Sequence, residues 1–120
     1  MSYGERWLKA SSANTVAYND TTGKKIGIEP GPIRVYRLSV HVTTAFAGGT
    51  SGNTIYTFSS ADGSVLGTIA VPYNAALDSI YTADVNVEAD KTAQGYITVA
   101  VTTQVTGETA GQVRAAVFYR

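Results

Sequence analysis

This 120-residue chain lacks cysteine, an excess of charge of either sign, and any long apolar run. Without cysteine it can form neither a disulfide nor a thiolate metal site, so apolar burial, strand pairing or another subunit must stabilise it. Nine basic side chains balance nine acidic ones, which argues against a nucleic-acid partner because such proteins need positive charge to displace counterions from phosphates. The absence of a membrane-length apolar stretch or a signal peptide predicts cytoplasmic synthesis and no membrane location.

Unbranched helix formers are also scarce, whereas Ser and Thr together make 25 residues. Thr, Val, Ile and Tyr suit a pleated, half-buried surface because their bulk near Cβ packs well there. Apolar and polar residues alternate, as in strands with one buried face. Between clusters of turn-forming residues, the sequence predicts eight strands: Thr15–Asn19, Lys24–Glu29, Ile33–Thr43, Thr54–Ser60, Val65–Val71, Ile80–Ala89, Gly95–Val105 and Gln112–Tyr119.

The longest predicted strand, Ile33–Thr43, has apolar residues in two opposite phases. Ile33 and Val35 share one phase, and the apolar residues from Leu38 onward share the other. A β-bulge near Tyr36 would turn both sets toward the same core, because a bulge inserts one extra residue into a strand.

Eight strands joined by turns of mixed length predict an all-β domain, an antiparallel β-sandwich resembling a jelly roll. A parallel sheet is excluded because it needs crossover helices, and the sequence offers only one helical turn, at Asn74–Leu77. The first dozen residues do not alternate, so we expect an extended N-terminal arm over residues 1–12 and the sandwich domain over residues 13–120.

The residue types for a reactive centre are missing. His41 is the only histidine, and it lies between two valines in a predicted strand. With no cysteine and no second histidine, one chain cannot assemble a His-based metal site, and no nucleophile-elbow motif is present. We expect a non-enzymatic protein without metal or cofactor, with His41 hydrogen-bonded in a sheet. In a trimer, three copies of His41 could also meet on the axis.

An acidic ladder occurs in the strand predicted at Ile80–Ala89 and just beyond it: Asp84, Asn86, Glu88 and Asp90. Period two places these side chains on one face, about 7 Å apart along the strand. Calcium needs six to eight oxygens that converge on one point, whereas a ladder spreads them along a line. A solvated outer face is therefore favoured, and ion binding remains the alternative.

The predicted arm contains four residues suited to anchoring: Tyr3, Arg6, Trp7 and Leu8. Trp7 is the only tryptophan, and a large exposed ring would leave its apolar area unused. It either covers an edge of its own domain or anchors the chain to a neighbouring subunit.

Tyrosines and one loop offer a second kind of binding site. Tyrosine rings stack on sugars, so Tyr56 and Tyr73 are candidate ligand-facing residues, together with Asn53 at the end of the loop 48–53. A carbohydrate- or receptor-binding module is therefore one alternative function. An enzyme subunit whose site a partner completes is another.

The tract from Ala45 to Thr54 and the hairpin Asp62-Gly63-Ser64 are similar to segments of head-decoration (cement) and fibre proteins of tailed phages. The resemblance extends over the whole chain in composition. It implies a virion structural protein, made in the host cytoplasm, that sits on the capsid as a homo-oligomer, with a trimer favoured. Such a protein clamps neighbouring major capsid proteins, and its N-terminal arm takes part.

Overall fold

A computed structural model describes residues 8–120, and within that range the chain forms strands and no helix. The strands are β1 (Lys9–Ala10), β2 (Asn14–Ala17), β3 (Lys24–Gly27), β4 (Ile33–Ala47), β5 (Asn53–Ser60), β6 (Val65–Pro72), β7 (Ile80–Ala89), β8 (Tyr96–Thr103) and β9 (Ala110–Tyr119). The prediction of an all-β chain is confirmed. Over this range no helix has the length and apolar character needed to cross a membrane.

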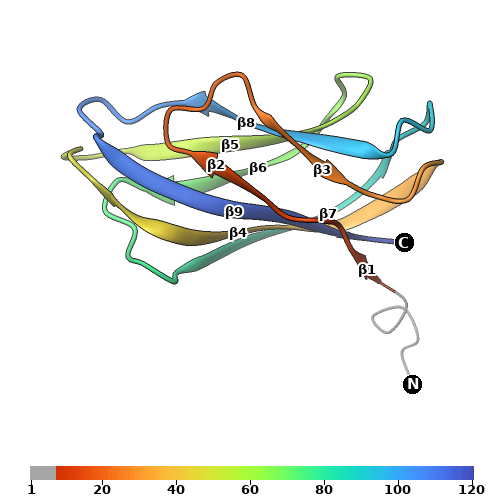
Figure 1. Cartoon of the computed structure of the whole chain (residues 1–120), viewed down its shortest axis with the longest axis horizontal. Coiled ribbons are helices and arrows are strands. Elements are labelled where there is room, and N and C mark those ends of the chain that lie inside the picture. The colour runs from red at the N-terminus through yellow and green to blue at the C-terminus, as the bar shows by residue number, and fades with distance from the viewer. Residues whose placement is uncertain (1–7) are drawn as a thin grey trace.

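The strands form two antiparallel sheets, seen as two layers in Figure 1. In sheet A, β9 pairs with both β1 and β2 on one side and with β4 on the other, and β4 pairs with β7. In sheet B the order is β3-β8-β5-β6. Within the described chain, β5 and β6 are the only consecutive strands that pair. The chain therefore crosses between the sheets repeatedly.

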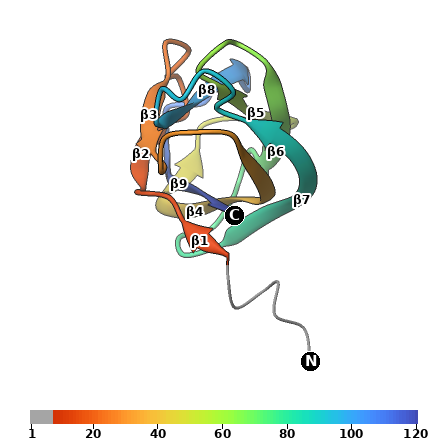
Figure 2. The ribbon, with the colours of Figure 1, turned by 90° about the vertical axis from the view of Figure 1, so that its right-hand side faces the viewer.

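The core lies between the two sheets, which enclose a common interior when viewed end-on (Figure 2). Alternate residues of each strand point inward, as the period-two pattern predicts. In β5 the inward positions include Tyr56 and Phe58, the two largest side chains that are fully buried. β7 covers an edge of this core with half-buried residues and exposes the alternate ones.

The bulge predicted near Tyr36 is confirmed. The register of β4 shifts between Val35 and Arg37 against both β7 and β9. As a result Val35 and Leu38 are both fully buried although they are three positions apart. The long strand thus keeps a continuous apolar face toward the core.

All eight predicted strands form, and Ile80–Ala89 has the predicted bounds. The additional strand, β1, lies inside the segment expected as an arm and pairs with β9 through Lys9 and Ala10. The helical turn expected at Asn74–Leu77 is wrong. There the chain makes turns, and Phe46 N donates to the carbonyl of Ala75 at 3.0 Å, which fixes this loop to β4.

The predicted acidic ladder is wrong at its last member: Asp90 does not share the exposed face, because it is fully buried. Its carboxylate accepts backbone N–H groups from Gly31 (3.0 Å), Gln94 (2.7 Å) and Gly95 (3.0 Å). Its own N–H donates to Ser60 Oγ at 2.9 Å. β7 ends at Ala89, so the alternation stops one residue earlier. Asp90 then turns inward and connects the β7–β8 loop, in which it lies, to the β3–β4 loop and to the end of β5.

Candidate binding surfaces

The first candidate surface is a hollow on the outer face of sheet A, here called the arm-base hollow. It measures about 450 Å³ and is lined by Leu8, Tyr36, Arg37 and Phe118. Leu8, Tyr36 and Phe118 are half-buried. The guanidinium of Arg120 lies 5.4 Å from the centre of the Tyr36 ring, and its Nη2 donates to the Tyr36 hydroxyl at 3.3 Å. Aromatic faces and arginine side chains thus meet at one point of the surface.

The arm-base hollow contains one of the four residues predicted as an anchor. Tyr3, Arg6 and Trp7 lie outside the described residues, whereas Leu8 is part of the lining. The described chain therefore begins at this hollow, and Trp7 is the next residue toward the N-terminus.

Ion pairs cross the outer face of sheet A beside this hollow. They are Arg34–Glu88 at 3.5 Å and Arg37–Asp84 at 2.9 Å. Asp84, Asn86 and Glu88 are exposed, so the predicted solvated face is confirmed for these three residues. Exposed pairs of this kind contribute about 0–1 kcal/mol each to stability. Within residues 8–120, no three His, Asp or Glu side chains gather in a way that could hold a metal ion.

His41 has the environment expected for a sheet histidine. It lies in β4 opposite Ile80 of β7 and Arg114 of β9. Its Nε2 and Oδ1 of Asp78 are 3.0 Å apart, so the expected hydrogen bond is confirmed. Asp78 adopts a φ of 67° in the loop before β7, which directs its side chain back toward β4.

The second candidate surface is a polar groove between the β4–β5 and β8–β9 loops, here called the loop groove. It measures about 310 Å³. Its lining contains no charged residue and consists of Thr50, Ser51, Gly52, Asn53, Thr103, Gln104, Val105 and Thr106. Asn53, predicted as ligand-facing, is exposed at this groove.

Backbone contacts hold the walls of the loop groove together. Oε1 of Glu108, a residue only 8% exposed, accepts the N–H of Gly49 at 3.0 Å. Gly48 has a φ of +103°, and a Cβ there would lie 2.6 Å from the carbonyl oxygen of Gly107, so this close approach requires glycine. Tyr73 was also predicted as ligand-facing. It is half-buried beside the β4–β5 loop and donates its N–H to Gly52 O at 3.1 Å.

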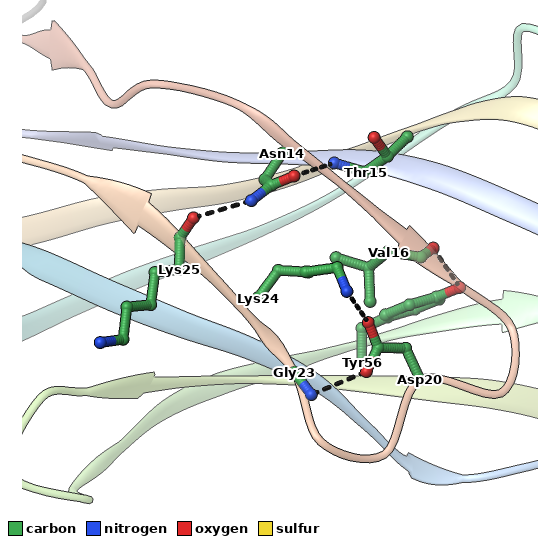
Figure 3. Close-up of polar contacts among 8 residues, drawn as sticks. All are labelled: Asn14, Thr15, Val16, Asp20, Gly23, Lys24, Lys25 and Tyr56. Atoms are coloured by element: carbon green, nitrogen blue, oxygen red, sulfur yellow. Dashed lines mark hydrogen bonds and ion pairs between the residues drawn. The ribbon is translucent and has the colours of Figure 1, made fainter.

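Tyr56 does not face a ligand, contrary to the sequence-based expectation. It is fully buried, and its hydroxyl donates to the carbonyl of Val16 at 3.3 Å (Figure 3). Burial raises the pKa of its phenol well above the usual value. Alternation along β5 explains the error, since Asn53 and Tyr56 are three positions apart and therefore point to opposite faces.

Asp20 is a structural carboxylate in the β2–β3 turn (Figure 3). Oδ1 accepts the N–H of Gly23 at 2.8 Å, and Oδ2 lies 3.1 Å from Lys24 Nζ. The hydrogen bond from Gly23, followed by the contacts with Lys24, lowers the pKa of this carboxyl. The carbonyl of Asp20 also accepts the N–H of Val101 at 2.8 Å. In the sequence, the turn pattern Asp-Thr-Thr-Gly at residues 20–23 was the feature that could have indicated this structural carboxylate.

The outer face of sheet B differs from that of sheet A because its strands contain no acidic residue. Their only charged residues are Lys24 and Lys25 on β3, and Nζ of Lys25 lies 4.4 Å from the centre of the Tyr96 ring. Neutral side chains cover the rest of this face, among them Ile55, Thr57, Ser59, Val65, Thr68, Ala70, Thr98, Ala100 and Thr102.

Comparisons of this chain with protein-family models, with curated proteins and with solved structures found no match.

Proposed function

We propose that this chain is a non-enzymatic virion structural protein that binds the outer surface of a phage capsid and stabilises the shell by bridging capsid subunits. The observation that carries the proposal is the arm-base hollow, which Leu8, Tyr36, Arg37 and Phe118 line together. Interface hot spots are enriched in tryptophan, tyrosine and arginine, clustered in pockets that exclude water. The neighbouring arm sequence adds Trp7 and further residues of these types.

We infer that the two sheets form a jelly-roll sandwich. Four antiparallel pairs among the eight strands β2–β9 support this inference: β2 with β9, β3 with β8, β4 with β7, and β5 with β6. These pairs are nested, since the outermost strands of the series pair with each other, then the next two, down to the hairpin of β5 and β6. Two Greek keys wound together give this order, which recurs in viral capsid domains and in lectins. The fold is compatible with the proposed role but does not by itself select it.

In this proposal the arm is the anchor. Tyr3, Arg6 and Trp7 engage the major capsid protein together with Leu8 and the arm-base hollow. A standard interface buries about 1,600 Å² in total, and this area must be exposed again before neighbouring subunits can separate. Many copies on one shell therefore add up to a large resistance against opening.

A homo-oligomer, with a trimer favoured, completes the proposal, and we assign the contact between copies to the outer face of sheet B. Burying a charge without a partner is costly, and β5, β6 and β8 offer a neighbouring copy a part of this face that has no charged side chain. Around a threefold axis, this part packs against a different surface of the neighbouring copy. A charge at its exposed position Thr68 (Thr68→Glu) should shift the mass measured by light scattering toward the monomer. If the wild-type chain is already monomeric at high concentration, the oligomer proposal is wrong.

The binding proposal is tested by co-sedimentation with assembled capsids of tailed phages, starting with the phage whose genome encodes this chain if its gene lies beside a major capsid gene. We expect saturable binding of the wild-type chain and at least tenfold weaker binding of Phe118→Ser, since one lining residue of the arm-base hollow is lost. The control is Leu77→Ser, which removes an apolar side chain that is 57% exposed in the β6–β7 loop. Absence of wild-type binding, or equal binding of both variants, would refute this assignment.

A further inference from the structure

We propose that the loop groove is a binding site for a neutral oligosaccharide, a function beyond the proposed attachment to a shell. The groove is an open hollow of about 310 Å³ between two loops. This volume falls at the lower end of the range for small-molecule sites. Its size fits a few sugar units better than a folded partner.

The chemistry of the lining selects the class of ligand. Four hydroxyl side chains and the two amides of Asn53 and Gln104 supply both donors and acceptors, and none of the eight lining residues is charged. Sugar hydroxyls also donate and accept, so they can match such a surface. The lining offers a charged ligand no side chain of opposite charge, and an apolar ligand would leave the polar groups unsatisfied at a cost. Val105, buried and 7% exposed, provides an apolar floor.

Hydrogen bonds hold the two walls of the groove together in the structure without a ligand. Glu108 fixes Gly49 from below, Thr109 N donates to Ala47 O at 2.8 Å, and Tyr73 N donates to Gly52 O at 3.1 Å. These bonds join the β4–β5 loop to the β8–β9 loop and to the end of β6. A preformed site loses less conformational entropy on binding than a mobile one, and this raises affinity.

The loop groove and the arm-base hollow lie at opposite ends of the same two strands. The hollow uses Tyr36 near the start of β4 and Phe118 near the end of β9, whereas the groove follows Ala47 and precedes Ala110. Ten residues of β4 lie between Tyr36 and Ala47, and the eleven steps along the strand span at most about 36 Å at the usual rise. Sugar binding and shell binding can therefore fail independently.

The test is a titration of the full ¹⁵N-labelled chain, followed by NMR, with maltotriose, cellotriose, mannotriose and lactose, and with 3′-sialyllactose as the charged counterpart of lactose. A neutral-glycan array extends the panel. We expect at least one neutral probe to shift the amides of residues 50–53 and 103–106. Asn53→Ala and Gln104→Ala should each weaken that binding at least tenfold. Gln94→Ala, an amide removed from the opposite end, should leave it unchanged.

The proposal is overturned if no neutral glycan binds, if the shifted amides lie elsewhere, or if Asn53→Ala and Gln104→Ala bind as tightly as the wild-type chain. It is also overturned if sialyllactose binds more tightly than lactose. Adding capsids instead of sugars distinguishes a protein partner, since groove amides that respond to capsids and to no sugar assign the groove to the shell. Unchanged capsid binding of the Asn53 and Gln104 variants would keep the two functions separate.

Discussion

Glu108 and Gly49 join two loops of this protein that lie far apart in sequence. Oε1 of the buried carboxylate accepts the N–H of Gly49 at 3.0 Å, and Oε2 has no hydrogen-bond partner among residues 8–120. Removing this acceptor leaves the part-buried N–H of Gly49 without its partner, which costs up to about 1–3 kcal/mol. We expect Glu108→Ala to lower the free energy of unfolding by this amount and to weaken sugar binding in the loop groove.

The matched variant is Glu108→Gln, which keeps a carbonyl oxygen for Gly49 and should lose less stability. Chemical denaturation and the hydrogen-exchange rate of the Gly49 amide measure both effects. If Glu108→Ala exchanged this amide as slowly as the wild-type chain does, the bracing role of Glu108 would be disproved.

Truncations at the N-terminus should separate binding from folding. Ser11 exchanges two hydrogen bonds with the backbone of Val117, and Ser12 exchanges two with that of Gly27, all between 2.7 and 2.9 Å. Deleting residues 1–12 should therefore cost at least about 2 kcal/mol. Deleting residues 1–7 keeps all four of these hydrogen bonds, so it should cost less stability than the longer deletion and still abolish shell binding. Tight binding of the 1–7 deletion would contradict the arm as anchor.

Asp90 should be the most sensitive acidic residue of β7 and its flanking loop. Asp90→Ala would leave the N–H groups of Gly31, Gln94 and Gly95 without their acceptor, so we expect a loss of more than about 3 kcal/mol. Asp84→Ala is the control, because its exposed pair with Arg37 contributes about 1 kcal/mol or less. Urea denaturation measures the unfolding free energy of both variants. Equal losses of stability would contradict the larger structural role of the buried carboxylate.

Tyr56 should act through the core and not through a ligand. Tyr56→Phe removes the hydrogen bond to Val16 and should cost about 0.5–1.5 kcal/mol without changing sugar binding. Because burial raises the folded-state pKa of Tyr56, its stabilising contribution is complete below the unfolded pKa near 10 and falls as the pH rises above it. Between about pH 9 and pH 11, the unfolding free energy of Tyr56→Phe, measured by chemical denaturation, should fall less than that of the wild-type chain. An equal fall would contradict the burial of the Tyr56 phenol.

Asp20 should contribute to the acid sensitivity of the fold. Its folded-state pKa is lowered from 3.8, so the ionised form stabilises the fold above that value. The contribution is lost as the pH falls through the lower folded-state pKa, within the range from about pH 5 to pH 2. Asp20→Asn should therefore lose less stability than the wild-type chain over that range, measured by denaturation at several pH values. Identical slopes would contradict this role.

Local periodicity made the strands predictable. Alternation over Ile80–Ala89 gave both bounds of β7, and the phase change between Val35 and Leu38 gave the bulge in β4. Partners in the sheets come from contacts far apart in sequence, which no local pattern specifies. Two residues, Lys9 and Ala10, were too few to show alternation, so their pairing with β9 was not predicted.

The candidate surfaces were predictable only in part. Asn53 was predicted because a loop of Gly, Ser and Thr implies an exposed tip. Gln104 and Thr106 gave no signal, because only the fold places their loop opposite the loop of Asn53. Phe118 and Tyr36 alternate like any strand residues, and only the register of β4 against β9 places both beside Leu8. Asp90 carries the same side chain as Asp84, and only its position just after the end of β7 explains its burial.

Shell stabilisation by this chain is tested most directly by the temperature at which DNA-filled capsids, stripped of the chain, open and release their DNA. A dye that reports released DNA measures this temperature with and without saturating amounts of the chain. We predict a higher opening temperature when the wild-type chain is bound, and no change with the 1–7 deletion. An unchanged opening temperature with the wild-type chain bound at saturation would contradict the account.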